Sequence, residues 1–164
     1  MYNRIRLEWV LPRAVESPGE RGSFIMPRPG AIRMALSVID IATKNKSLDA
    51  PVIPAAAHRF LNAEGHHILV CYLDAGPVGF ITGVEMTHPD KGTEMFLYER
   101  GVAGAFRRRG HGGALVRALA ALARCRGCYG MWVGTESDND AALATYRNAV
   151  GEEDGFVVFN WTFN

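Results

Sequence analysis

Two kinds of hydrophobic spacing divide the chain. Its middle part contains apolar runs of strand length separated by turn residues, which predict strands over 68–73, 78–85 and 94–102. Since short polar turns connect these runs, we expect an antiparallel meander. Farther along, Leu115, Leu119 and Leu122 recur at helical spacing. They predict a long helix, with Gly127 in the position of a C-terminal glycine.

The remaining elements are shorter. We expect a strand over 131–133, a helix capped by Ser137 or Asp138 and running through Tyr146, and a final strand over 156–163. Three strands are thus followed by helix, strand, helix and strand. The predicted fold class is α/β (α+β), with a central mixed, mostly antiparallel sheet flanked by helices.

The N-terminal region, residues 1–34, is irregular because prolines and glycines interrupt every periodic pattern. Residues 5–10 could form a first strand, 31–42 have helical apolar spacing, and 55–62 could form a short helix. A length of 164 residues fits one domain over 1–164, large enough to bury a core.

The composition of the chain limits the classes of partner that the protein is expected to bind. The chain is 48% hydrophobic and 21% charged, with a net charge of +1, so no overall field favours nucleic acid or an acidic membrane. No apolar run reaches membrane-spanning length, and a signal-peptide pattern is absent, so we expect a cytoplasmic protein without a membrane partner. Cys125 and Cys128 have CxxC spacing. We interpret the pair as structural and expect no metal, with zinc or redox chemistry as the alternative.

Arginines concentrate in one stretch. Seven of the 18 basic residues lie between Arg100 and Arg126, and all seven are arginine. Three of them begin the segment Arg107–Gly113, which joins a predicted strand to the long helix and contains three glycines. Unpaired N–H groups at a helix start, flanked by glycine and arginine, are suited to a pyrophosphate. The alternative is a loop that merely makes the helix start soluble. Three glycines at that point argue against it, because they destabilise the helix and a purely solubilising loop does not explain their presence.

Two known phosphate-binding patterns are absent. The segment has no Gly-Lys-Ser/Thr, which excludes a P-loop. It has no GxGxxG after a first parallel strand, so a dinucleotide-binding fold is unsupported. The arginine cluster is also too short and too glycine-rich to track a nucleic-acid groove.

Arg107-x-x-Gly110-x-Gly112 resembles the acetyl-CoA signature of the GNAT superfamily, Q/R-x-x-G-x-G/A. Residues 97–102 are similar to the family strand with an acidic residue three positions before a valine, and 139–146 to its N-x-x-A-x-x-L-Y helix. The likeness extends over roughly residues 60–164 and is closest to the aminoglycoside 3-N-acetyltransferase branch. Val150, before Gly151, departs from the glycine pair of relatives.

The resemblance implies acetyl-CoA as cofactor, bound at a splayed strand pair. Backbone groups beside Val102 would pair with the pantetheine arm, and amides from Arg108 to Gly113 would hold the pyrophosphate. The side chains of Arg107 and Arg109 could add charge. The expected cofactor-binding residues are Val102, Ala103, Arg107, Arg108, Arg109, Gly110, His111, Gly112, Gly113, Asn139 and Ala142.

The resemblance also implies direct attack of an amine on the thioester. Glu99 is the candidate base, alone or through a water relay; otherwise it is an ordinary strand carboxylate that pairs with Arg100 or Lys91. Tyr146 matches the general acid of the family; otherwise it is a core aromatic residue. A backbone N–H near Val102 would meet the tetrahedral oxyanion.

The expected function is acetyl transfer to a primary amine of a small cationic acceptor, such as an aminoglycoside. The alternatives are a protein or peptide N-acetyltransferase and an acetyl-CoA-binding module without turnover. A homodimer, paired through an exposed final strand, is a further expectation.

Overall fold

The computed structural model describes residues 6–7, 31–34, 51–73, 76–149, 151–155 and 158–162. Within them, one sheet has its strands in sequential order, β1 to β6. The strands are β1 (Arg6–Leu7), β2 (Ala31–Met34), β3 (His66–Leu73), β4 (Gly76–His88), β5 (Gly92–Val102) and β6 (Met131–Trp132). The helices are α2 (Pro54–Asn62), α3 (His111–Cys125), α4 (Asp140–Asn148) and the short 3₁₀ helix η1 (Gly104–Phe106).

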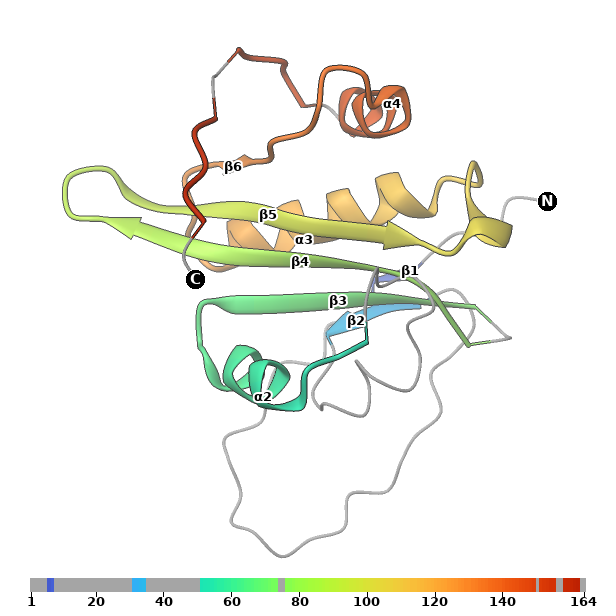
Figure 1. The fold of residues 1–164 in the computed structure, drawn as a ribbon, viewed down its shortest axis with the longest axis horizontal. Helices are drawn as coiled ribbons and strands as arrows, with labels where there is room; N and C mark the ends of the chain where they lie inside the picture. Colours follow the sequence, from blue (N-terminus) through green and yellow to red (C-terminus); the bar gives the residue numbers. More distant parts are fainter. Residues whose placement is uncertain are drawn as a thin grey trace, which may run out of the picture.

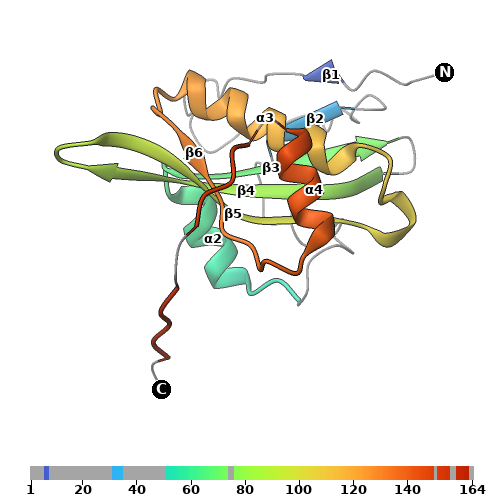
Figure 2. The same ribbon diagram turned by 90° about the horizontal axis from the view of Figure 1, so that it is seen from above.

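The sheet is mixed and mostly antiparallel. Strands β2 to β5 pair antiparallel with their neighbours, whereas β1 with β2 and β5 with β6 are parallel. Helix α2 covers one face, and α3 covers the other, with α4 beside α3 (Figures 1 and 2). This is the fold class that the sequence predicts.

Successive side chains of a strand point to opposite faces of the sheet, and this alternation produces a hydrophobic core on each face. On the α3 face, Leu69, Ile81 and Leu97 pack with α3 residues such as Leu115 and Leu119. On the α2 face, the buried residues are Ile68, Val70, Tyr72, Phe80 and Ala57. Consecutive residues of β3 and β4 therefore enter different cores, which explains why these strands have unbroken apolar runs.

A β-bulge at Tyr98 shifts this alternation in β5. Thr82 pairs with Glu99 but Gly83 pairs with Leu97, so β5 contains one residue more than its partner. The hydroxyl of Thr82 accepts a hydrogen bond from the Glu99 amide at 3.1 Å, beside the bulge. Residues on either side of Tyr98 consequently follow opposite numbering parity.

The meander, the short helix at 54–62 and the long helix α3 confirm the predictions for those segments. Arg6–Leu7 is strand, as expected for that part of 5–10. The helix expected over 31–42 is wrong at its start. Residues 31–34 are a strand because Ile32 pairs with Cys71 and enters the α3-side core. Residues 35–42 lie outside the described residues.

Three details near the C-terminus differ from expectation. The cap of α4 is Asn139, whose side chain accepts from the Ala142 amide at 3.1 Å, not Ser137 or Asp138. The predicted strand at 156–163 is not seen in its described part, residues 158–162. Val150 lies outside the described residues.

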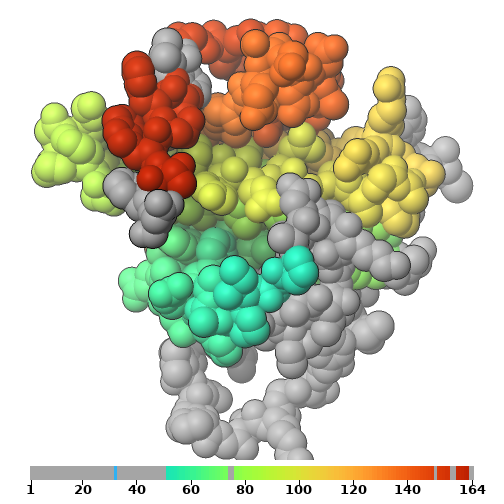
Figure 3. Space-filling model, viewed as in Figure 1, coloured from blue at the N-terminus to red at the C-terminus, as the bar shows by residue number. Residues whose placement is uncertain are grey.

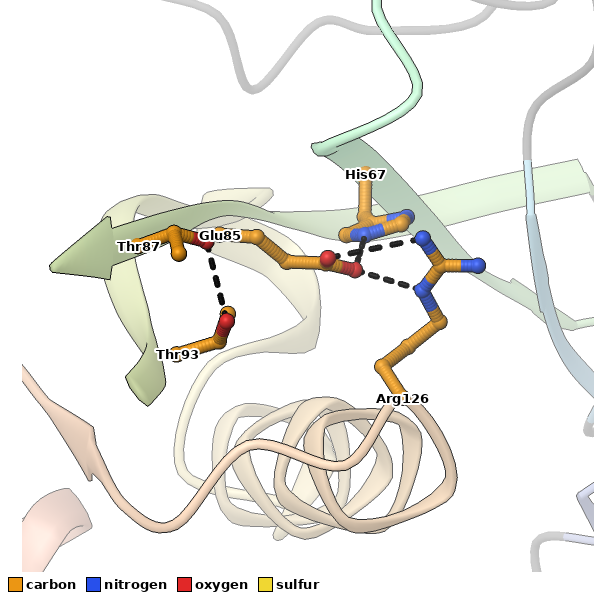
Figure 4. A network of polar contacts seen from close by, with 5 residues as sticks. All are labelled: His67, Glu85, Thr87, Thr93 and Arg126. Atoms are coloured by element: carbon orange, nitrogen blue, oxygen red, sulfur yellow. Dashed lines mark hydrogen bonds and ion pairs between the residues drawn. The ribbon is translucent and has the colours of Figure 1, made fainter. Parts of the chain in front are cut away.

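An ion pair links the C-terminal end of α3 to strand β4. Gly127 has a φ of +78°, and the Cys128 amide donates to the Ala123 carbonyl at 3.0 Å, which forms a Schellman motif. Next to it, Arg126 Nε lies 2.5 Å and His67 Nε2 2.7 Å from the Glu85 carboxylate (Figure 4).

No described helix combines the length and apolar character that crossing a bilayer requires. Among the described residues, no three histidine, cysteine or acidic side chains gather as a metal site would require. Cys125 is the last residue of α3 and Cys128 follows Gly127, so the pair lies at the predicted helix end. Its structural role stays a prediction.

Candidate active site

The arginine-glycine segment forms a tight loop between β5 and α3. The Arg107 side chain folds back, and its Nε donates to the Val102 carbonyl at 2.9 Å. Arg108 and Gly110 both have left-handed backbone, with φ of +59° and +84°. Glycine at 110 is explained by this conformation, which other residues adopt at a cost of about 1 kcal/mol or more. Arg109 lies over the Phe106 ring, 5.9 Å from its centroid.

The first turn of α3 lacks a conventional cap. Gly110, the N-cap, has no side chain to accept from the first amides, and no acidic residue occurs in the first turn. The helix start therefore presents N–H groups and the positive end of its dipole to whatever lies in front of it. The exposed arginines 107–109 add positive charge. These atoms form a corner of the surface next to α4 (yellow beside orange in Figure 3).

His111 lies at the base of this loop. Its side chain is buried, and Nδ1 has no hydrogen-bond partner in the described part of the chain. Burial, and then the positive charge of Arg109, lowers the pKa of His111 below its ordinary value. This shift favours the neutral form of the ring.

Strands β5 and β6 separate soon after they meet. They pair only at Met95 with Met131 and Phe96 with Trp132. From Leu97 to Val102, β5 continues without a described strand on that side. This is the splayed strand pair that the fold prediction includes. The gap opens toward the same end of the molecule as the arginine loop, because β5 leads directly into η1 and α3.

The residues on β5 at this gap face both layers. Arg100 pairs with Ile81 and reaches the α3 side, where its guanidinium carbon lies 5.5 Å from the centroid of the Tyr146 ring. Glu99 pairs with Thr82, on the opposite face. Glu99 and Tyr146, the two predicted catalytic residues, therefore flank β5 from different sides of the sheet.

Two expected cofactor-binding residues have structural roles here. The side chain of Asn139 caps α4, and Ala142 is buried under that first turn. Gly112 is also constrained by the protein: a Cβ there would lie 2.5 Å from Nη1 of Arg100. Residues 102–113 thus lead from the end of β5 into the first turn of α3, and the Arg100 side chain lies between that turn and Tyr146. Asn139 and Ala142 stabilise the start of α4, the helix that contains Tyr146.

Sequence reasoning missed the position of Arg100, which it considered only as a partner for Glu99. The available signal was the charged residue itself, between inward-facing Leu97 and Val102. That signal is hidden by the bulge at Tyr98, because simple alternation from Leu97 would put Arg100 on the other face.

Comparison with known proteins agrees with this geometry. The model of the acetyltransferase (GNAT) family matches residues 36–151. A search among curated proteins gives no significant match.

Several solved structures share the fold. One is AAC(6')-Iy in complex with the bisubstrate analogue CoA-S-monomethyl-acetylneamine, with 20% identity, a TM-score of 0.70, and coverage of 81% of this chain and 97% of that chain. An aminoglycoside acetyltransferase from an uncultured soil metagenomic sample, in complex with sisomicin, has 21% identity, a TM-score of 0.65 and coverage of 73% and 79%. AAC(6')-Ih from Acinetobacter baumannii has 15% identity, a TM-score of 0.64 and coverage of 81% and 98%.

Identities this low establish a common fold and not a common acceptor. Two of these neighbours are named as 6'-N-acetyltransferases, so the structural comparison does not single out the 3-N branch. The family match, in contrast, extends over most of the chain, including the loop, the splayed strands and the tyrosine helix. The chain therefore belongs to the GNAT family of acetyltransferases.

Proposed function

We propose that this protein transfers the acetyl group of acetyl-CoA to a primary amine on a small cationic acceptor. The observation that carries the proposal is the uncapped start of α3, with arginines 107–109 in front of it and the gap between β5 and β6 beside it. Such a helix start binds phosphate oxygens through its amides. A gap along β5 leaves backbone groups for the amides of a pantetheine arm.

Two side chains would divide the proton transfers. Glu99, on the α2 face of β5, would take a proton from the attacking amine, directly or through water. Tyr146, on the α3 face, would protonate the sulfur of the departing CoA. Their placement on opposite sides of one strand suits a thioester held in the gap, because the amine then approaches from one side and the thiolate leaves toward the other.

Features near the gap support a small acceptor that carries rings and positive charge. On the α2 face, the Phe96 ring lies 4.4 Å from that of Trp132 and 5.9 Å from that of Tyr98, measured between centroids. The Tyr98 ring is 69% exposed and could lie against a sugar ring. Exposed carboxylates precede and begin α4, at Glu136, Asp138 and Asp140. They would attract a polycation.

An aminoglycoside is the acceptor class that we would test first. The neighbours in complex with sisomicin and with the acetylneamine analogue favour it. The sequence resemblance favours the 3-amine, whereas the neighbours named as 6'-N-acetyltransferases favour the 6'-amine. Mass spectrometry and NMR of the product would distinguish the two positions.

The test is release of free CoA from acetyl-CoA with aminoglycosides, polyamines and a lysine-containing peptide as separate acceptors. We expect turnover with at least one aminoglycoside, and a kcat lowered about a hundredfold but still measurable in Tyr146→Phe, with acetyl-CoA binding retained. Activity with peptide alone would replace the small acceptor by a protein. Tight acetyl-CoA binding without turnover across the panel would favour the non-catalytic module.

The remaining assignments stay proposals. We infer a cytoplasmic enzyme whose domain extends over 1–164 and which pairs as a homodimer. In support of the dimer, the aromatic side chains of Phe159 and Trp161 are each 74% exposed near the C-terminus. A monomeric mass in light scattering would contradict this assembly.

A further inference from the structure

Arg100 lies where three elements meet. It projects from β5, its guanidinium lies over the ring of Tyr146 in α4, and its Nη1 occupies the space beside Gly112 in the first turn of α3. The same space is bounded by Thr145, whose Cγ2 would lie 3.5 Å from a Cβ at 112. A side chain at position 112 would therefore displace the Arg100 guanidinium from its place over the Tyr146 ring.

The surroundings of Arg100 are unfavourable for a positive charge. A positive charge at the start of a helix opposes the helix dipole. The Nε atom is buried and has no hydrogen-bond partner in the described residues. The loop next to it already contains three further arginines. An arginine in these surroundings is expected to have a compensating negative charge nearby at some stage of the reaction.

The proposed reaction creates such a charge at Tyr146. The amine nitrogen bonds to the thioester carbon, and the carbon–sulfur bond then breaks with its electron pair on sulfur. The Tyr146 hydroxyl gives its proton to that sulfur, which yields CoA thiol and a phenolate. The proton lost by the amine goes to Glu99 or water, and solvent later reprotonates the phenolate. The negative charge of the phenolate is spread into the ring that Arg100 covers.

We propose that Arg100 is a positioning residue for Tyr146, which orients the ring and stabilises the phenolate formed when the thiolate is protonated. This inference rests on the proposed function and on Tyr146 as its general acid. Arg100 acts through the tyrosine and not on the reacting atoms. The pyrophosphate is the other negative charge in reach of the loop, so the experiment must separate an effect on kcat from an effect on cofactor affinity.

The experiment is a double-mutant cycle on the full chain. Arg100→Met and Arg100→Lys are each made alone and with Tyr146→Phe, and Arg124→Met, at the opposite and exposed end of α3, is the matched control. The measurements are kcat at saturating acetyl-CoA and acceptor, by CoA release, and the Kd for CoA, by calorimetry. A binding enthalpy for CoA equal to that of the wild-type protein also demonstrates that each variant is folded.

We expect Arg100→Met to lower kcat about tenfold and to leave the Kd for CoA within about twofold. Arg100→Lys should retain more than half of the lost activity, since the charge remains. In the Tyr146→Phe background, Arg100→Met should cause no further loss. The control should have wild-type kcat.

Two results would overturn the role of Arg100 while leaving the enzyme intact. One is an equal, additive loss of kcat in both backgrounds. The other is a large rise in the Kd for CoA with unchanged kcat, which would make Arg100 a cofactor anchor. Absence of CoA release by the wild-type protein with every acceptor would overturn this inference together with the proposed function. Should Arg100→Met not fold, Arg100→Gln replaces it in the cycle, with the same outcomes.

Discussion

The two ends of α3 differ in how their unpaired backbone N–H and C=O groups are treated. At the C-terminal end, Gly127 and Cys128 form a Schellman motif, and Arg126 pairs with a carboxylate that also contacts buried His67 (Figure 4). At the N-terminal end, Gly110 provides no side-chain cap and the first turn has no acidic residue. One end is completed by the protein itself, and the other presents donors and positive charge to solvent.

The difference teaches where stability and function separate on this helix. Acidic side chains stabilise a helix start, and basic ones stabilise a helix end. The C-terminal end follows this rule with Arg124, whereas the N-terminal end has arginines in front of it. Only the N-terminal end lacks the charges that stabilise a helix. We expect such a departure where the helix end binds a ligand. Each prediction below alters a residue at one end of α3 or in contact with it.

The largest effect is expected from Gly113→Asp, in the first turn. A Cβ at 113 meets only Nη1 of Arg117, at 3.2 Å, which is the flexible end of an exposed side chain. The new carboxylate should leave the melting temperature unchanged or raise it, because it complements the helix dipole. It should also repel the pyrophosphate and raise the Kd for CoA at least about a hundredfold. Calorimetry and thermal unfolding measure the two quantities.

The control for that variant is Gly113→Asn, which has the same size without the charge. We expect it to raise the Kd for CoA by less than about tenfold. Equal affinity for CoA in Gly113→Asp and the wild-type protein would place the pyrophosphate elsewhere.

At the other end, Glu85→Ala should lower the free energy of unfolding by about 2 kcal/mol. It leaves Nε2 of His67, a residue only 4% exposed, without its acceptor. Arg126→Ala is the milder comparison, at about 0.5 kcal/mol, because Arg126 is partly exposed and the His67 contact persists. Urea denaturation gives both values. Neither variant should alter the Kd for CoA, and a change in affinity would mean that the two ends are not independent.

Gly110→Ala and Gly127→Ala form a matched pair, since both glycines have positive φ and open space around the missing Cβ. Each substitution should destabilise the protein by about 1 kcal/mol through its backbone strain. Only Gly110→Ala should also weaken CoA binding, by about tenfold, because it distorts the loop. If Gly127→Ala weakens binding as much, the effect is one of general stability.

The smallest effect concerns pH. Burial raises the pKa of Glu85, but hydrogen bonds from Arg126 and His67 outweigh it, so the folded pKa lies below its ordinary value. The unfolded chain therefore binds this proton at higher pH than the folded chain. The stabilisation is fully present above the ordinary glutamate pKa, about 4.3, and is lost as pH falls through the folded value. In urea unfolding, the difference between wild type and Glu85→Gln should stay constant from pH 7 to about pH 4.3 and shrink below it. A difference that grows below about pH 4.3 would reverse the sign.

The parts of the fold that the sequence predicts correctly are local. The loop before α3 is encoded by consecutive arginines and glycines, and α3 by leucines at helical spacing. Gly127 predicts the end of α3 because the helix end depends only on the left-handed backbone conformation of that one residue. Such features require no knowledge of distant contacts, and the site loop is among them.

The errors occur where a distant partner decides. Ile32 fits a helical pattern, but pairing with Cys71 makes its segment a strand. Ser137, Asp138 and Asn139 are all suitable caps, and only the register of α4 selects the last. Arg100 requires three elements to be placed before its role is visible. The catalytic roles of Glu99 and Tyr146 remain predictions that the proposed kinetics would test.

The extra residue in β5 has a consequence for comparing sequences. The arginine-glycine motif is an anchor from which positions can be counted back along the strand. Such counting assumes a constant number of residues between the motif and each side chain. Because Tyr98 has no opposite residue in β4, relatives with and without this bulge place the residues before Tyr98 at offsets from the motif that differ by one. Alignments across this strand should therefore follow the strand pairing, with a gap at the bulge, before a role is transferred to a residue that precedes it.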